Sequence, residues 1–136
     1  MEEKFEQFVS YFRNSSCKIK DITSNSNEVK LTIELGGAPA VISYSGYMVT
    51  ILHYLFPVRE HPMFFYDKIN TLDSKFRSMA NIGLNCEKFN GQEYVYCAFA
   101  NMGNGNGYAD ADTFFEKFNQ AFEKIEPDLR DLKNYL

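Results

Sequence analysis

One segment, residues 29–35, alternates strictly between apolar and polar side chains and constrains the fold more than any other stretch. Period-two alternation is typical of a β-strand with one buried face and one wet face. Gly36 and Gly37 follow directly, as expected for a turn into a neighbouring strand. An antiparallel sheet is therefore the starting point for the fold.

More strands are expected on both sides of this segment. Residues 17–22 have a β-like pattern, and residues 40–44 and 47–56 complete an antiparallel meander. The last of these is apolar on both faces, so it requires cover on both sides. Its two predicted faces carry Met48, Leu52, Tyr54 and Phe56 on one side and Val49, Ile51 and Leu55 on the other.

A hairpin is expected later in the chain. Asn90 and Gly91 are typical of a two-residue turn, and they separate a loosely alternating segment, 79–89, from a second alternating segment, 92–100. Residues 101–108, rich in Gly and Asn, predict a flexible loop after this hairpin.

Three segments repeat apolar residues at helical spacing. The first ends at Asn14, and the second begins at Pro62 and ends near Ser78. The third occupies most of the carboxyl end, where Asp110 and Asp112 offer caps, Thr113 with Glu116 forms a capping box, and Pro127 predicts a kink or a break into two collinear pieces.

Together these segments predict one α+β domain over residues 1–136. Its antiparallel sheet has five to six strands, flanked by helices in the order helix, meander, helix, hairpin, helix. Because three helices of this length are too few to cover both faces of such a sheet, association with a partner is favoured. The alternative is a monomer in which the helices divide between the two faces.

Composition narrows the possible functions. The chain of 136 residues is 45% hydrophobic and 24% charged, and its 13 Phe and 9 Tyr against no Trp indicate an aromatic core. A net charge of −4 argues against nucleic-acid binding. The amino terminus has no signal-peptide pattern and no segment has the length of a membrane span, so we expect no membrane partner and a cytoplasmic protein.

No catalytic or metal site is indicated, and no cofactor is expected. Gly103, Gly105 and Gly107 have the wrong spacing for a phosphate-binding loop. The nearby Asn and Asp residues do not follow the calcium-loop order. His53 and His61 have no partner at metal-ligand spacing, although proximity of one of them to a cysteine in space stays open. Cys17, Cys86 and Cys97 are expected to be reduced thiols.

Residues 69–76, Ile-Asn-Thr-Leu-Asp-Ser-Lys-Phe, together with the order of the elements, resemble the YbjN and type III secretion chaperone-like superfamily. Asp73 stands where the family usually has a second Asn. The resemblance implies a non-enzymatic domain that tends to dimerise and, in the chaperone branch, holds client segments against sheet edges and apolar grooves.

The leading functional prediction is a non-catalytic, protein-binding or chaperone-like adaptor domain, as a homodimer or with another protein chain. Tyr54, Tyr94 and Tyr96 are predicted to form the binding surface, because tyrosine suits a surface that is wet when free and buried when bound. The alternative is a small-ligand-binding domain or weak enzyme with a pocket between the sheet and the third helix, gated by the loop 101–108.

Overall fold

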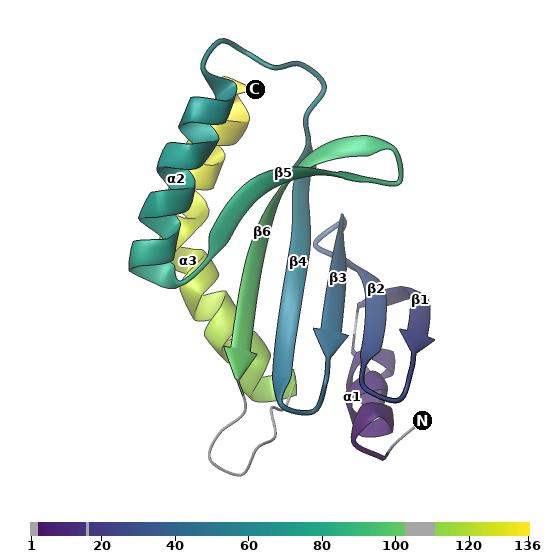
Figure 1. Cartoon of the computed structure of the whole chain (residues 1–136). Helices are drawn as coiled ribbons and strands as arrows, with labels where there is room; N and C mark the ends of the chain where they lie inside the picture. The colour runs from purple at the N-terminus through teal and green to yellow at the C-terminus, as the bar shows by residue number, and fades with distance from the viewer. Residues whose placement is uncertain (1–2, 16, 103–110) are drawn as a thin grey trace.

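The computed structural model describes residues 3–15, 17–102 and 111–136 as a six-stranded antiparallel sheet with three helices (Figure 1). The strands lie in the order β1-β2-β3-β4-β6-β5. In chain order, the elements are α1 (Glu3–Arg13), β1 (Lys18–Ser24), β2 (Val29–Leu35), β3 (Ala38–Tyr44), β4 (Met48–Pro57), α2 (Phe65–Ala80), β5 (Gly83–Phe89), β6 (Gln92–Met102) and α3 (Ala111–Tyr135). The α+β class and the predicted order of elements are confirmed.

Two of the predicted turns have the backbone geometry that their residues favour. Gly36 and Gly37 connect β2 to β3 with φ of 61° and 81°. Asn90 and Gly91 connect β5 to β6 with φ of 50° and 82°. Consecutive positive φ angles match the right-handed twist of the flanking strands, and Gly and Asn adopt them at low cost. These turns fix the register of two hairpins.

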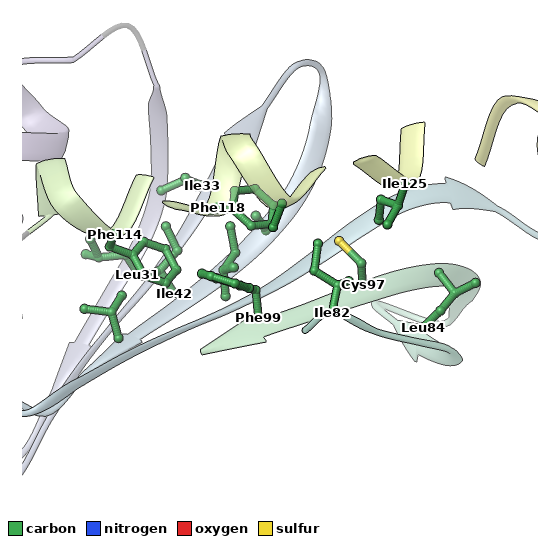
Figure 2. Packing of buried hydrophobic residues seen from close by; sticks show 14 of the residues in the cluster. Leu31, Ile33, Ile42, Ile82, Leu84, Cys97, Phe99, Phe114, Phe118 and Ile125 are labelled. Carbon is green, nitrogen blue, oxygen red and sulfur yellow. The ribbon is translucent and has the colours of Figure 1, made fainter. Parts of the chain in front are cut away.

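The register brings one apolar side chain from each central strand into a continuous row. Leu31 of β2 pairs with Ile42 of β3, which pairs with Ile51 of β4, which pairs with Phe99 of β6. All four side chains are buried. They mark the face of the sheet that the helices cover, which we call the covered face (Figure 2).

The helices pack on or beside this covered face. The Phe8 ring of α1 stacks on Tyr44 of β3 at a centroid distance of 4.2 Å. Phe114 and Phe118 of α3 each lie 5.7 Å from Phe99 of β6. Helix α2 lies beside α3 and along β5 (Figure 1). In the described part of the chain, no helix packs on the opposite face of the sheet.

A β-bulge in β4 changes which face its last residues occupy. Tyr54 pairs with Tyr96, but the next pair in the register is Phe56 with Val95. Because a bulge inserts one extra residue, Phe56 moves to the covered face instead of sharing a face with Tyr54. Phe56 accordingly lies in the hydrophobic core with Val95. The prediction that Phe56 and Tyr54 share one face is therefore wrong.

The predicted start of the second helix is also wrong. Helix α2 begins at Phe65, because Pro62 to Phe64 form a turn in which the Phe65 N–H donates to the Pro62 carbonyl. Helix α3 begins at Ala111, so Asp112 and Thr113 lie inside it and the predicted capping box is wrong, whereas the predicted cap Asp110 lies outside the described residues. Helix α3 continues through Pro127 as one element. Strand β6 extends to Met102, and the rest of the predicted glycine-rich loop lies outside the described residues.

Candidate functional site

The face of the sheet opposite the helices carries an apolar row across its central strands. Val41 of β3 pairs with Leu52 of β4, which pairs with Ala98 of β6. All three side chains are half-buried by their neighbours on the sheet. We call this surface the open face. Its central members are Thr32, Val41, Ser43, Thr50, Leu52, Tyr54, Phe89, Tyr94, Tyr96 and Ala98, and the same register places the charged residues Lys30, Glu34 and Glu87 on it toward its edges.

The three tyrosines predicted as a binding surface lie together on the open face. The Tyr54 ring centroid is 5.9 Å from that of Tyr94, 5.7 Å from that of Tyr96 and 4.7 Å from that of Phe89. Tyr54 is only 4% exposed, because these rings surround it. Tyr94 and Tyr96 stay half-buried and are the members of the cluster with accessible surface.

The edge of the sheet at β5 is closed by a side chain from α2. The Leu84 N–H donates to Asp73 Oδ1 at 2.7 Å, and the same carboxylate pairs with Arg77 Nε at 3.0 Å. The next outward N–H, from Cys86, donates to Asn85 Oδ1 at 2.8 Å. Since these edge donors already have side-chain acceptors, addition of a further strand at this part of β5 is disfavoured.

Replacing Asp73 tests the importance of this closure. Asp73→Ala removes the acceptor of a partly buried N–H and is expected to lower the free energy of unfolding by about 1–3 kcal/mol. Asp73→Asn keeps an acceptor oxygen and loses mainly the exposed Arg77 pair, so it should cost less than about 1 kcal/mol. Urea unfolding measures both variants. Equal losses would show that the ion pair, not the N–H acceptor, carries the stabilisation.

The opposite edge, β1, is irregular and charged. Its pairing with β2 shifts between Ile19 and Asp21, and Lys20 forms an exposed ion pair with Glu34 at 3.2 Å. Bulges and lysines on an edge strand both disfavour edge-to-edge pairing. The two sheet edges are thus less suited to bind a partner chain than the open face.

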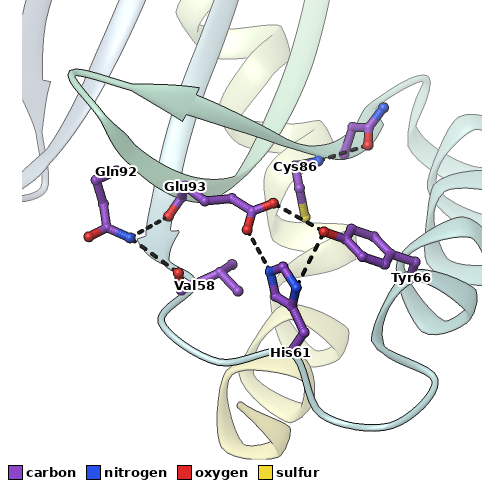
Figure 3. Close-up of polar contacts among 7 residues, drawn as sticks. Val58, His61, Tyr66, Cys86, Gln92 and Glu93 are labelled. Atoms are coloured by element: carbon purple, nitrogen blue, oxygen red, sulfur yellow. Dashed lines mark hydrogen bonds and ion pairs between the residues drawn. The ribbon is translucent and has the colours of Figure 1, made fainter.

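A second group of polar side chains joins the β4–α2 connection to the β5–β6 hairpin (Figure 3). His61 Nε2 lies 2.6 Å from Glu93 Oε1, and the Tyr66 hydroxyl donates to Glu93 Oε2 at 3.3 Å. The His61 ring stacks on Phe65 at 5.4 Å. The Glu93 carbonyl also accepts from the Val58 N–H at 2.8 Å. These contacts hold the β4–α2 connection against the hairpin. We therefore interpret His61, Tyr66 and Glu93 as a structural clip.

The cysteine beside this clip is not an activated nucleophile. Burial, with the Glu93 carboxylate, raises the pKa of the Cys86 thiol to about 11. A thiol with this pKa is almost entirely protonated at neutral pH, whereas catalytic cysteines have lowered pKa values. The described residues also contain no group of three His, Cys, Asp or Glu side chains arranged to hold a metal ion.

The structure does bring one histidine and one cysteine together, which the sequence left open. His53 of β4 pairs with Cys97 of β6 on the covered face. Cys97 is fully buried, and burial raises its pKa to about 12. Cys97 therefore belongs to the core with half-buried His53 beside it, and the pair offers no reactive thiolate to a substrate. All three cysteines are free thiols.

The predicted pocket between the sheet and α3, gated by the loop 101–108, stays a prediction, because residues 103–110 lie outside the described residues. Phe114, Phe118 and Ile125 of α3 are at most 2% exposed and point onto the sheet (Figure 2). A hollow is also present at the β1–β2 turn, lined by residues including Thr23, Asn25 and Lys30. Its lining is polar, and Glu28 and Lys30 are its charged members.

Sequence reasoning missed an exposed apolar segment just before α2. Met63 is 76% exposed and Phe64 is 69% exposed. Phe64 also has a φ of 64°, which is unusual for a bulky residue. The Tyr135 hydroxyl donates to the Met63 carbonyl and fixes this segment against the end of α3. The one local signal was Pro62, which permits a turn as readily as a helix start.

No helix in the described residues is long and apolar enough to cross a membrane. Comparison with family models, with curated proteins and with solved structures found no match to this chain in any of the three.

Proposed function

We propose that this chain is a non-catalytic, protein-binding domain that associates through the open face of its sheet, with a second copy of the chain as the partner. The observation that supports this proposal is the placement of all three helices on or beside the covered face. The apolar row Val41, Leu52 and Ala98 is thereby left without cover. Uncovered apolar surface on a sheet is typical of an interaction site.

The open face has the dimensions of a protein interface. Six strands about 4.8 Å apart span about 24 Å, and a strand of seven residues at about 3.3 Å each spans about 23 Å. The flat area is on the order of 550 Å², and side-chain relief increases the accessible area. Weak to standard interfaces bury roughly 600–800 Å² per partner. Two open faces packed together reach this scale.

The side chains of the open face suit a surface that is hydrated when free and buried when bound. Its apolar centre is bordered by Thr32, Thr50 and Ser43, whose hydroxyls hydrogen-bond to water when the face is free, and by the charged Lys30 and Glu34 of β2. Tyr94 and Tyr96 present rings with polar tips at one side. Sheet-on-sheet packing of two such faces forms a sandwich in which inward side chains interdigitate. The resemblance to dimerising chaperone-like domains is consistent with this arrangement.

Leu52→Asp tests the proposal at the centre of the open face. Burying a carboxylate in the middle of an apolar interface is unfavourable, so we expect the dissociation constant for self-association to rise at least tenfold. Sedimentation velocity over a concentration series measures this constant. Leu52→Thr, which introduces a neutral β-branched residue that strands favour, should give a smaller increase and guards against loss of folding.

Asn119→Asp is the matched control, because it adds the same charge at an exposed position of α3. We expect this variant to associate like the wild type. A wild-type chain that is monomeric at every concentration would contradict a second copy as partner. Unchanged association of a folded Leu52→Asp variant would contradict the open face as the site.

A further inference from the structure

His53 is the one histidine on the covered face, where it is half-buried and its ring lies beside the aromatic rings of α3. Its Nε2 lies 3.2 Å from the Leu35 carbonyl oxygen of β2. A carbonyl accepts only, so Nε2 carries the proton of the neutral ring and Nδ1 carries the lone pair. Nδ1 is fully buried and has no hydrogen-bond partner among the described residues.

The surroundings of the ring are apolar on the side of α3. The Phe118 and Phe122 rings lie 6.5 Å and 6.3 Å from the His53 ring. Both rings are hydrocarbon and offer no hydrogen-bond acceptor to a second ring proton. A second ring proton would therefore introduce a positive charge and an unpaired N–H beneath α3 without compensation.

Within the described ranges, the groups that face His53 from the other elements supply no counter-charge. Cys97 pairs with it from β6 and is a neutral thiol, since its pKa is raised to about 12. Ala40 pairs with it from β3. The nearest charged residue along β2 is Glu34, which pairs with Lys20. The charged residues on this part of α3 are exposed, and they are Glu116, Lys117, Glu123 and Lys124.

We propose that His53 is an acid-sensitive latch between the sheet and α3, so that protonation of its ring loosens this part of α3 and uncovers apolar surface. Rings in contact with His53 come from the middle of α3, and α3 supplies Phe118 and Ile125 to the core. Opening there exposes the covered face over β4 and β6. Through this latch, a fall in the pH of the surroundings increases the apolar surface that the domain exposes.

The direction of the pH effect follows from linkage. Burial lowers the pKa of His53 below its ordinary value of 6.5, and the Leu35 carbonyl opposes this only in part. As pH falls below about 6.5, an open or unfolded chain binds a proton that the closed form does not. The closed form is therefore at full stability above this pH and loses stability as pH falls toward the lowered pKa.

Hydrogen exchange of the full chain between pH 7.5 and pH 5.5, corrected for intrinsic exchange rates, tests the latch. We expect protection of the α3 amides between residues 118 and 125 to fall several-fold at the lower pH, up to the limit of about tenfold that one proton bound at a pKa of 6.5 in the open form allows, while amides of β2 keep their protection. His53→Gln, which retains a donor for the Leu35 carbonyl, should abolish the fall. His61→Gln is the control, because His61 is exposed, and it should behave like the wild type.

Retention of the same fall in His53→Gln, or an equal fall in β2 and α3, would overturn the latch. If His53→Gln does not fold, His53→Phe supplies an apolar ring in the same Phe118 and Phe122 environment. The ring resonances of the wild type give an independent reading, since the chain has only 2 His. A His53 ring that is protonated at pH 5.5 while α3 stays protected would also contradict the proposal.

Discussion

Phe114→Ala is expected to lower the free energy of unfolding by about 3–5 kcal/mol, the usual cost of deleting a buried phenyl ring. Phe114 is fully buried, and its ring lies 5.7 Å from Phe99 and 5.2 Å from Phe115. The loss combines the lost burial of the ring with the cavity left between α3 and the sheet. Urea unfolding followed by circular dichroism measures the change.

Phe64→Ala is the matched control for this substitution. It deletes the same ring at a position that is 69% exposed, so we expect a change within about 0.5 kcal/mol. The left-handed backbone at residue 64 is comparably strained with Ala as with Phe. Similar losses for the two variants would mean that α3 does not anchor the core through Phe114 as the structure shows.

Pro127→Ala is expected to raise the free energy of unfolding by about 2 kcal/mol. Pro127 lies inside α3 and is exposed, so its ring contributes little to the core. A proline within a helix removes one hydrogen bond and crowds the carbonyl four residues before it, at a cost of about 3 kcal/mol. The greater freedom of alanine in the unfolded chain offsets up to about 1 kcal/mol of the gain.

Glu126→Ala is the control for the proline variant, because it changes the preceding exposed residue of the same helix. Glu126 has only a 3.9 Å exposed pair with Arg130, so its removal should change stability by less than about 0.5 kcal/mol. Thermal unfolding with calorimetry compares the two variants. A neutral or destabilised Pro127→Ala would show that α3 is already relaxed around the proline.

The proposed association and the proposed latch involve opposite faces of one sheet. Leu52 lies on the open face, and its neighbour in sequence, His53, lies on the covered face. A side chain period of two places consecutive residues of a strand on opposite sides. Variants at the two positions therefore separate the two proposals, since Leu52→Asp tests association and His53→Gln tests the response of α3 to acid.

Local sequence patterns determined the elements of this fold and much of their pairing. The alternation in residues 29–35 specified β2 and its buried side, because a strand with one wet face needs a period of two. Asn90 and Gly91 specified the β5–β6 hairpin, because both residues tolerate positive φ. The phenylalanines of α1 and α3 recur at helical spacing, and this spacing places them on one side of each helix, where they are buried against the sheet.

Part of the candidate surface was also predictable from the sequence. Tyr94 and Tyr96 lie two apart on one strand, so they share a face whatever the rest of the chain does. That Tyr54 joins them depends on the register between β4 and β6, and its burial beneath Phe89 depends on the path of the hairpin. Neither follows from local spacing, so Tyr54 was expected at the surface although it is buried.

Only the tertiary structure decided the features that join distant parts of the chain. The sequence alone determined which segments are strands and helices, since backbone sterics and side-chain period act between near neighbours. The placement of the helices relative to the sheet, the shift of Phe56 at the bulge, and the Asp73 contact with the β5 edge arise from packing across many residues. Such packing depends on how all the apolar faces fit together at once. It therefore cannot be predicted from the sequence pattern of any single segment.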